Sequence, residues 1–226
     1  MSKTDHLRNV PIFTALSDSD LNGIASKMVS RDYEKGQVIL LEESTGETFF
    51  IITSGTVKVT RLSDDGREVI LALLGESDFF GEMSLLDGEG RSANIVANED
   101  AEVMTLSRRD FLEYLETYPK IAIALLEELA VRIRKSDQQI ESLSLSDSEQ
   151  RIGMTLIRLA EEGGTIKRGD VSVKNLPYQQ DIANMAGTSR ETVSRTLKLL
   201  EDKKLVKRSG SDITIFNFNT FRQYFS

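Results

Sequence analysis

Residues 79–93 read FFGEMSLLDGEGRSA, and the rest of the chain is organised around this stretch. It predicts a short apolar strand, a small helical run from Gly81 and a glycine-bounded turn before Arg91. Glycine lacks a Cβ and permits positive φ, so the backbone here can come close to another group. Arg91 is a planar cation suited to a phosphate, and Glu82 can accept hydrogen bonds from sugar hydroxyls. A salt bridge between Glu82 and Arg91 that only pins a loop is the alternative interpretation.

The composition excludes several classes of function. A chain of 226 residues is long enough for two domains. It has no cysteine, which excludes disulfides, iron–sulfur clusters, thiolate metal sites and cysteine nucleophiles. His6 is the single histidine, so histidine-dependent dyads and multi-histidine metal sites are excluded too. Without a nucleophile–base pair or a P-loop, we predict that the protein is not an enzyme and has no metal cofactor.

The charge is divided unevenly along the chain. The net charge is −8, yet residues 148–226 carry 13 Lys and Arg against 9 Asp and Glu. The preceding residues carry 15 against 27, so an acidic front precedes a basic end. This division is typical of an effector domain joined to a DNA-binding domain. The start, MSKTDHLRNV, has no signal-peptide pattern, and we expect a cytoplasmic protein without membrane spans.

Short β-rich runs with a period of two extend from Tyr33 to Leu106 and are separated by turns. They predict seven or eight strands in a jelly roll or small barrel, with residues 79–93 as a binding insertion. A helix whose apolar positions end at Met28 precedes them, and another helix follows over residues 108–118.

A long helix is predicted from Pro119, which can occupy the first helical position. Six of its residues recur at spacings of three and four and form a heptad seam, which predicts a parallel coiled coil and a homodimer. The alternative is an amphipathic helix that packs on its own β-domain. A Ser-rich break at residues 143–149 is the expected hinge. The seam residues are Leu126, Leu129, Ile133, Ser136, Ile140 and Leu143.

Residues 177–208 predict two helices, 179–186 and 189–203, joined across Gly187 as a helix-turn-helix. On the second helix, Val193, Leu197 and Leu200 share one face. The opposite face carries side chains that can read base edges in a major groove. These are Arg190, Glu191, Ser194, Arg195 and Lys198.

Two alternatives stay open on this second helix. Thr188 and Glu191 have the spacing of a capping box, which would give Glu191 a structural role. Arg190 and Arg195 could contact phosphates alone and read no bases.

Together, the glycine-rich stretch, the heptad helix and the Ser-Arg-Glu-Thr-Val-Ser-Arg run at 189–195 resemble the cyclic-AMP receptor (Crp–Fnr) family of bacterial transcription regulators. The resemblance spans residues 9–218 and implies an α+β fold. It implies an effector-binding jelly-roll β-roll over residues 1–118 and a dimerisation helix and hinge over 119–147. A winged helix-turn-helix DNA-binding domain would occupy 148–226.

The resemblance also implies an effector, 3′,5′-cyclic AMP. Arg91, Ser92 and the backbone near Gly81 would hold the phosphate, and Glu82 the ribose. Ser136 and Asp137 would contact the base, although Asp137 departs from the family pattern, and Ser136 could instead fix coiled-coil register. The implied effector-binding residues are Gly81, Glu82, Met83, Ser84, Arg91, Ser92, Ala93, Ser136 and Asp137.

For DNA, the resemblance implies a palindrome with TGTGA-like half-sites, read by Arg190, Glu191 and Arg195, and RNA polymerase as a further partner. Lys203, Lys204, Lys207 and Arg208 are expected to contact phosphates beside a β-rich wing. The alternatives are a regulator of this fold that is effector-independent, or one that responds to another ligand such as cyclic-di-GMP. The implied DNA-binding residues are Thr188, Ser189, Arg190, Glu191, Ser194, Arg195 and Lys198.

Overall fold

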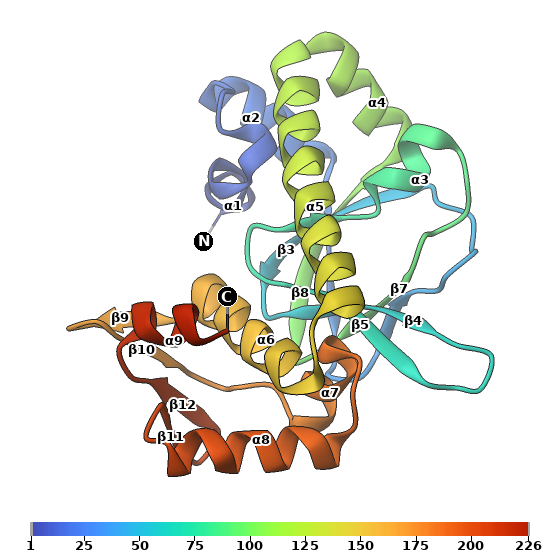
Figure 1. The fold of residues 1–226 in the computed structure, drawn as a ribbon. Coiled ribbons are helices and arrows are strands. Elements are labelled where there is room, and N and C mark those ends of the chain that lie inside the picture. The colour runs from blue at the N-terminus through green and yellow to red at the C-terminus, as the bar shows by residue number, and fades with distance from the viewer. Residues whose placement is uncertain (1, 226) are drawn as a thin grey trace. The chain divides into compact units, whose positions relative to one another are not determined.

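The computed structural model describes residues 2–225 and forms two compact units, residues 1–135 and 136–226. The boundary falls within one long helix, α5, Pro119–Leu145 (Figure 1). The earlier helices are α1 Lys3–Asn9, the 3-10 helix Pro11–Phe13, α2 Asp18–Lys27, α3 Glu82–Asp87 and α4 Arg108–Thr117. The strands of this unit are β1 Val29–Tyr33, β2 Val38–Leu40, β3 Thr48–Ser54, β4 Val57–Leu62, β5 Glu68–Leu74, β6 Phe79–Phe80, β7 Asn94–Ala97 and β8 Ala101–Ser107.

The N-terminal unit is a sandwich of two antiparallel sheets. One sheet has the strand order β1-β8-β3-β6 and the other β2-β7-β4-β5. The expected β-roll is therefore confirmed, although its first strand starts at Val29 and not at Tyr33. A hairpin turn over residues 64–67 joins β4 to β5, and Gly66 in this turn has a φ of +80°.

Strand β3 shows how alternation assigns residues to two cores. Phe50 and Ile52 point between the two sheets and pack with Phe80. Phe49 and Ile51 point to the other face, where the helices cover the sheet. Since successive strand residues face opposite sides, this continuous apolar run serves both layers. The residues of the helix-covered core include Leu7, Ile24, Phe49, Ile51, Phe79, Met104, Phe111, Ile121 and Leu125.

Helix α5 has two different apolar stripes. Ile121 and Leu125 are buried in the core of the N-terminal unit, so part of the helix packs on its own β-domain. Of the seam residues, Leu126, Ile133 and Ile140 are more than 60% exposed, and Leu143 is 53% exposed. The helix therefore packs on its own β-domain through one face, as the alternative expected, and the coiled coil and homodimer stay predictions. Among residues 2–225, none of the helices combines the length and apolar character needed to cross a bilayer.

In the C-terminal unit, helices pack on a small antiparallel sheet with the order β11-β12-β10-β9. Strands β11 and β12 form the wing hairpin. Asp147 caps α6 with a capping box, which places the helix start inside the expected Ser-rich break. The elements are α6 Ser148–Gly163, β9 Thr165–Lys167, β10 Asp170–Val173, α7 Gln179–Ala186, α8 Arg190–Asp202, β11 Val206–Ser209, β12 Asp212–Ile215 and α9 Phe218–Tyr224.

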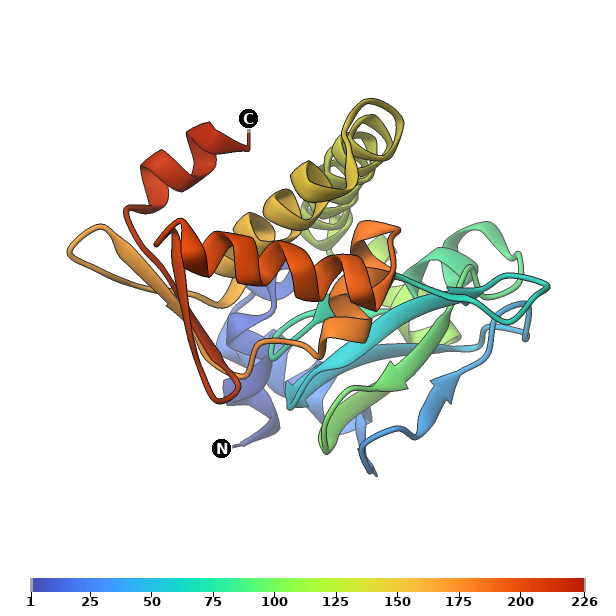
Figure 2. The same cartoon turned by 60° about the horizontal axis from the view of Figure 1, so that its bottom comes forward.

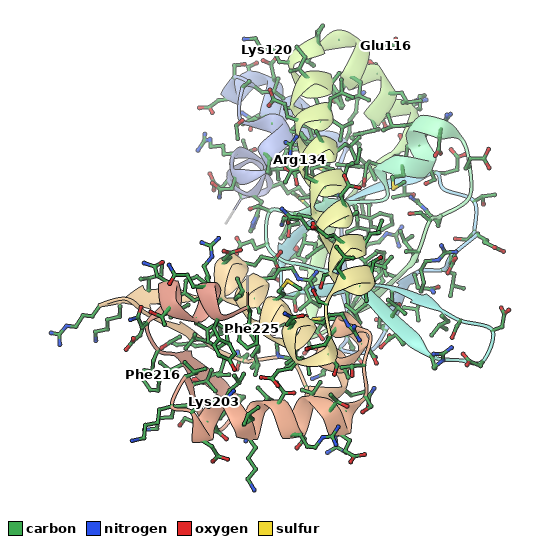
Figure 3. All side chains as sticks on the ribbon, in the orientation of Figure 1. Glu116, Lys120, Arg134, Lys203, Phe216 and Phe225 are labelled. Carbon is green, nitrogen blue, oxygen red and sulfur yellow. The ribbon has the colours of Figure 1, made fainter. Side chains whose placement is uncertain are left out.

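The last helix, α9, is an addition that the sequence pattern did not predict. Phe221 and Phe225 are buried in the core of the C-terminal unit, and the Phe225 ring (Figure 3) lies against Gly153 of α6. A Cβ on Gly153 would be 2.3 Å from that ring, so only glycine lets α9 pack here. The chain end therefore completes the core beneath the helix-turn-helix.

Candidate functional site

The 79–93 stretch forms strand β6, a left-handed turn at Gly81 and the short helix α3. Gly81 has a φ of +85°, and a Cβ there would lie 2.7 Å from Arg91 Nη1 and 3.0 Å from the Thr48 carbonyl oxygen. Both the conformation and the space require glycine. The absence of a side chain at Gly81 therefore lets the Arg91 guanidinium enter the interior of the site.

Arg91 is 5% exposed, which is unusual for an arginine. Its Nη1 donates to the Gly81 carbonyl oxygen over 2.7 Å and to Ser84 Oγ over 2.8 Å. Its Nη2 donates to the Thr48 carbonyl oxygen over 2.8 Å. Burial lowers the pKa of the guanidinium, and the nearby Glu82 carboxylate opposes that shift.

The Nε atom of Arg91 is buried and has no hydrogen-bond partner among the described residues. An unpaired buried donor costs about 1–3 kcal/mol, and the cost is higher when the group is charged. The buried cation has no ion-pair partner among the described residues, because its acceptors are carbonyl and hydroxyl oxygens. A buried cation of this kind can bind an anion, and a cyclic phosphate can accept from the unpaired Nε–H.

The alternative interpretation required a salt bridge between Glu82 and Arg91, and the structure does not have it. Its ion pair is with Arg132 of α5, whose Nη1 lies 3.1 Å from Glu82 Oε1. Arg132 Nη2 also donates to the Phe79 carbonyl oxygen over 2.9 Å, and the guanidinium lies 4.5 Å from the centre of the Phe79 ring. Burial raises the pKa of the Glu82 carboxyl, and the charges of Arg132 and Arg91 oppose that shift.

Arg132 is a site residue that the sequence reasoning missed. It lies one helical turn before Ser136, so it shares a helix face with a residue that the sequence did single out. That spacing was the available signal, together with the Glu128–Arg132 pair at helical spacing. Because α5 carries several other charged residues, this spacing alone did not distinguish Arg132 from them.

The other predicted effector residues differ in exposure. Ala93 is buried, while Ser92 is exposed and its Oγ lies 3.6 Å from Met83 Sδ. Ser136 and Asp137 are exposed on α5, one turn beyond Arg132, and they fall in the C-terminal unit. Their contact with an effector base stays a prediction.

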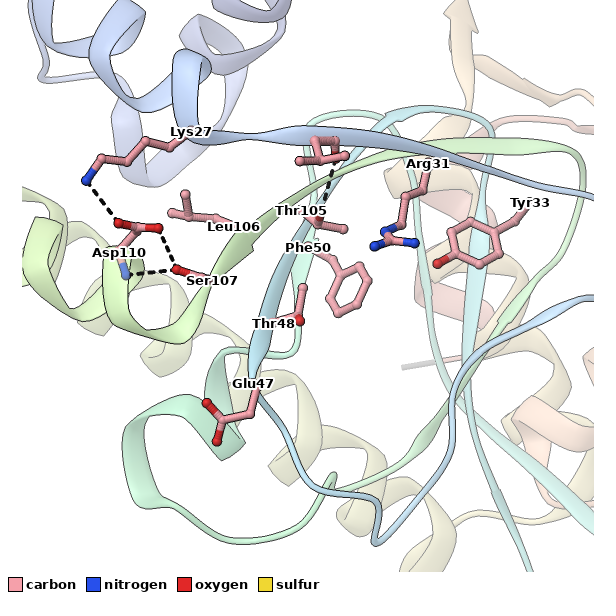
Figure 4. Close-up of a pocket in the computed structure, with 11 residues that line it drawn as sticks. Lys27, Arg31, Tyr33, Glu47, Thr48, Phe50, Thr105, Leu106, Ser107 and Asp110 are labelled. Carbon is pink, nitrogen blue, oxygen red and sulfur yellow. Dashed lines mark hydrogen bonds and ion pairs between the residues drawn. The ribbon is translucent and has the colours of Figure 1, made fainter.

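A separate surface hollow of about 360 Å³ opens along β1, β3 and β8 (Figure 4). On one wall, Lys27 binds Asp110 over 2.9 Å and Ser107 also donates to Asp110. Thr48 and Phe50 line it as well, but no residue of 79–93 does. The hollow therefore does not coincide with the predicted effector site.

In the C-terminal unit, α7 and α8 are joined by Gly187, which ends α7 with a φ of +60°. The apolar face of α8 is buried as predicted: Val193, Leu197 and Leu200 are at most 1% exposed. In Figure 2, α8 (orange) lies along the outside of this unit. Its exposed side chains include Arg190, Glu191, Ser194, Arg195 and Lys198.

The structure contradicts the alternative of a capping box between Thr188 and Glu191. The N-cap of α8 is Ser189, whose Oγ accepts from the Thr192 backbone N–H over 3.1 Å. The helix begins one residue later than the box required, so Glu191 is not the third residue of the helix. Among the described residues the Glu191 carboxylate has no hydrogen-bond partner, which leaves it available for a base.

Two of the four cations expected to contact phosphates already have partners inside the unit. Lys203 (Figure 3) donates to the Tyr224 hydroxyl and lies 3.9 Å from Glu149. Arg208 pairs with Glu201, and this pair lowers the pKa of the Glu201 carboxyl. Lys204 and Lys207 are exposed. We therefore assign a structural role to Lys203 and Arg208.

Comparisons with known proteins match both units. Residues 30–118 match the cyclic nucleotide-binding domain, and residues 150–224 match the Crp-like helix-turn-helix domain. The cyclic AMP receptor protein of Thermus thermophilus is 34% identical over 210 residues, which cover 92% of this chain and 94% of the relative. A CRP-like cAMP-activated global transcriptional regulator of Mycobacterium tuberculosis is 29% identical over 92% of this chain and 93% of its own.

Solved structures share the fold. The c-di-GMP-responsive global regulator CLP of Xanthomonas campestris has a TM-score of 0.75 at 22% identity, covering 88% of this chain and 99% of its own. At that identity the likeness concerns the fold alone. The chain joins a cyclic nucleotide-binding domain to a DNA-binding helix-turn-helix. These two domains, their order and the 34% identical relative show that the chain belongs to the Crp–Fnr family, whose members are transcription regulators and not enzymes.

Proposed function

We propose that the protein is a homodimeric, cytoplasmic transcription regulator that binds a TGTGA-like palindrome under the allosteric control of 3′,5′-cyclic AMP. The observation that carries this proposal is the buried Arg91 guanidinium with its unpaired Nε donor. A cyclic phosphate supplies both the negative charge and the acceptor that this group lacks. The relatives whose printed names include cyclic AMP support the choice of nucleotide.

Within this proposal, Glu82 holds the ribose 2′-OH while it remains paired with Arg132. Arg132 belongs to α5, so the ligand site and the long helix share an ion pair. A ligand that hydrogen-bonds to Glu82 changes the free energy of the Glu82–Arg132 ion pair. It thereby changes the preferred placement of α5. Ser136 and Asp137, one turn further along α5, are proposed to contact the base.

The exposed seam of α5 supports the homodimer. Leu126, Ile133 and Ile140 recur every seven residues and are each more than 60% exposed in the single chain. Covering such a stripe with a second copy removes apolar surface from water, and a two-stranded coiled coil does so at this spacing. A dimer would hold two recognition helices about 34 Å apart, one turn of DNA.

On DNA, the exposed face of α8 supports base reading by Arg190, Glu191 and Arg195. Arginine can donate two hydrogen bonds to guanine, and glutamate can accept from cytosine N4. This set of donors and acceptors suits the guanines and complementary cytosines of TGTGA. Contact with RNA polymerase is also proposed, and only the family to which the chain belongs supports it.

The test is fluorescence anisotropy with a labelled duplex that carries TGTGA and its inverted repeat about one helical turn apart, at one fixed salt concentration. Binding is measured without nucleotide and with cyclic AMP, cyclic GMP or cyclic-di-GMP. We expect cyclic AMP alone to tighten binding. Tight binding that no nucleotide changes would overturn the effector, and absence of specific binding would overturn the operator.

An effector-independent regulator is the second candidate. The Glu82–Arg132 ion pair links residues 79–93, here called the cassette, to α5 through two side chains of the protein itself. In that case, Arg91 serves only to hold the cassette together. Operator affinity that is high and equal with and without each nucleotide would favour this candidate.

A further inference from the structure

Gly46, in the loop between β2 and β3, lies against the cassette. A Cβ on Gly46 would be 2.1 Å from Ser84 Oγ, 2.7 Å from Ser84 Cβ and 3.0 Å from Arg91 Cζ. Distances below 3.0 Å are not found for real Cβ atoms, so any other residue here must displace Ser84 or the loop. Gly46 has no positive φ, so its reason for being glycine is space alone.

The loop cannot easily move away, because its backbone is tied to the chain around Arg91. The Glu43 N–H donates to the Arg91 carbonyl oxygen over 2.9 Å, and the Arg91 N–H donates to the Ser44 carbonyl oxygen over 3.0 Å. These two hydrogen bonds hold the loop beside the cassette at Glu43 and Ser44, and Ser44 is only two residues before Gly46. A side chain at position 46 would therefore press on Ser84 and Arg91.

The Ser84 hydroxyl, which occupies the space that Gly46 leaves, is buried and has both its roles filled. Ser84 Oγ accepts from Arg91 Nη1 over 2.8 Å and is 3.4 Å from the Gly81 carbonyl oxygen, to which it donates. Ser84 is 3% exposed. Its hydroxyl therefore acts on Arg91 and has no hydrogen left for a ligand.

We propose that Gly46 and Ser84 are positioning residues that hold the Arg91 guanidinium so that its buried Nε–H stays available for the phosphate of the effector. Ser84 Oγ and the Gly81 carbonyl oxygen accept the two Nη1 hydrogens of Arg91, and the Thr48 carbonyl oxygen accepts one Nη2 hydrogen. A serine hydroxyl fits at position 84 only because position 46 has no side chain. This inference rests on the proposed cyclic-nucleotide site.

Ser84→Ala removes one acceptor from Arg91 and leaves the rest of the site in place. We expect the affinity for cyclic AMP, measured by isothermal titration calorimetry, to fall about tenfold, as for loss of a hydrogen bond to a charged group. Gly46→Ala displaces Ser84 and Arg91 together, so its affinity should fall further. Ser26→Ala and Gly23→Ala in α2 are the matched controls, since both positions are exposed and far from the cassette in sequence, and nothing lies within 4 Å of a Cβ on Gly23.

A second measurement needs no ligand. In ¹⁵N-labelled protein, hydrogen-bonded Nη protons of Arg91 exchange slowly and give side-chain signals that an Arg91→Lys variant loses. We expect Ser84→Ala and Gly46→Ala to shift or broaden these signals, while both controls leave them unchanged. A purely structural role for Ser84 would lower stability without moving them.

The outcomes separate the two proposals. Shifted Arg91 signals together with weakened cyclic AMP binding support the positioning role. Unshifted signals, or unchanged affinity in Ser84→Ala, overturn it, even if Gly46→Ala does not fold. Shifted signals in a protein that binds no nucleotide support the positioning of Arg91 and overturn the proposed effector.

Discussion

Arg132 of α5 donates to the buried carboxylate of Glu82 in the cassette over 3.1 Å. The arginine side chain is 28% exposed and the glutamate side chain 4%, so the pair sits at the edge of the interior. It joins the proposed ligand site to the helix that carries the seam, and we propose that a ligand acts on the helix through this pair.

Replacing Arg132 tests how much the pair contributes to stability. Arg132→Met keeps an unbranched side chain but removes the guanidinium, which leaves the Glu82 charge buried without its partner. We expect the free energy of unfolding, from urea titration, to fall by about 2–4 kcal/mol. Arg134→Met, on the exposed side of the same helix (Figure 3), is the control and should change it by less than about 0.5 kcal/mol. Equal stability of the two variants would contradict a role for the pair.

The burial of Glu82 predicts a dependence of stability on pH. Because the pKa of Glu82 is raised in the folded state, the folded protein binds this proton more tightly than the unfolded chain. The contribution of Glu82 to stability is therefore full below the ordinary glutamate pKa and is lost as pH rises through the raised value. Glu82→Gln removes this titration. The stability of the natural protein relative to Glu82→Gln, from urea titrations at a series of pH values, should decrease as pH rises above the ordinary glutamate range. A constant difference would mean that Glu82 does not titrate abnormally.

Arg91→Leu removes the proposed phosphate donor and keeps a side chain that fills apolar space. We expect cyclic AMP to lose its effect on operator binding in the anisotropy assay, because the phosphate loses its charged partner. Arg67→Leu, in the exposed β4–β5 hairpin, is the control and should respond to cyclic AMP like the natural protein. A full response in Arg91→Leu would place the effector elsewhere.

The α5 seam predicts a dimer that a single charge can disrupt. Ile133→Asp places a carboxylate in the centre of the seam, where pairing with a second copy would bury it at a high cost in free energy. Sedimentation equilibrium should then give a monomer, against a dimer for the natural chain. Ile166→Asp, at an exposed apolar position outside the helix, should stay dimeric. A dimeric Ile133→Asp would show that the chains associate through another surface.

The cap of α8 separates structural from base-reading residues. Ser189→Ala should lower the free energy of unfolding by about 1 kcal/mol, since it removes the cap. Glu191→Ala should leave stability nearly unchanged but reduce discrimination at one base pair by about 1–3 kcal/mol. Competition binding with operators altered at single positions measures the second effect. Loss of stability without loss of discrimination in Glu191→Ala would return that residue to a structural role.

The sequence by itself determined the features that depend on local periodicity. The alternation of β-rich runs predicted a jelly roll or small barrel, and the structure has two packed antiparallel sheets. The helical spacing of Val193, Leu197 and Leu200 identified the buried face of α8, and all three are at most 1% exposed. Gly81 and Arg91 were singled out because glycine permits close approach of the backbone and arginine suits a phosphate, and their contact with an effector stays a prediction. Periodicity reports these features because each residue's environment is set by its neighbours a few positions away.

The tertiary structure decided what depends on contacts between distant segments. Glu82 pairs with Arg132, which lies 50 residues further along the chain, and not with Arg91. The sequence has no local pattern that favours one of these two cations over the other. The choice of Ser189 over Thr188 as the cap depends on where the backbone turns after Gly187. The sequence does not show why positions 46 and 153 are glycine. The structure does, because it places Ser84 against Gly46 and Phe225 against Gly153. Packing of this kind is a property of the assembled core, because the space at one residue is defined by side chains that the chain brings there only on folding.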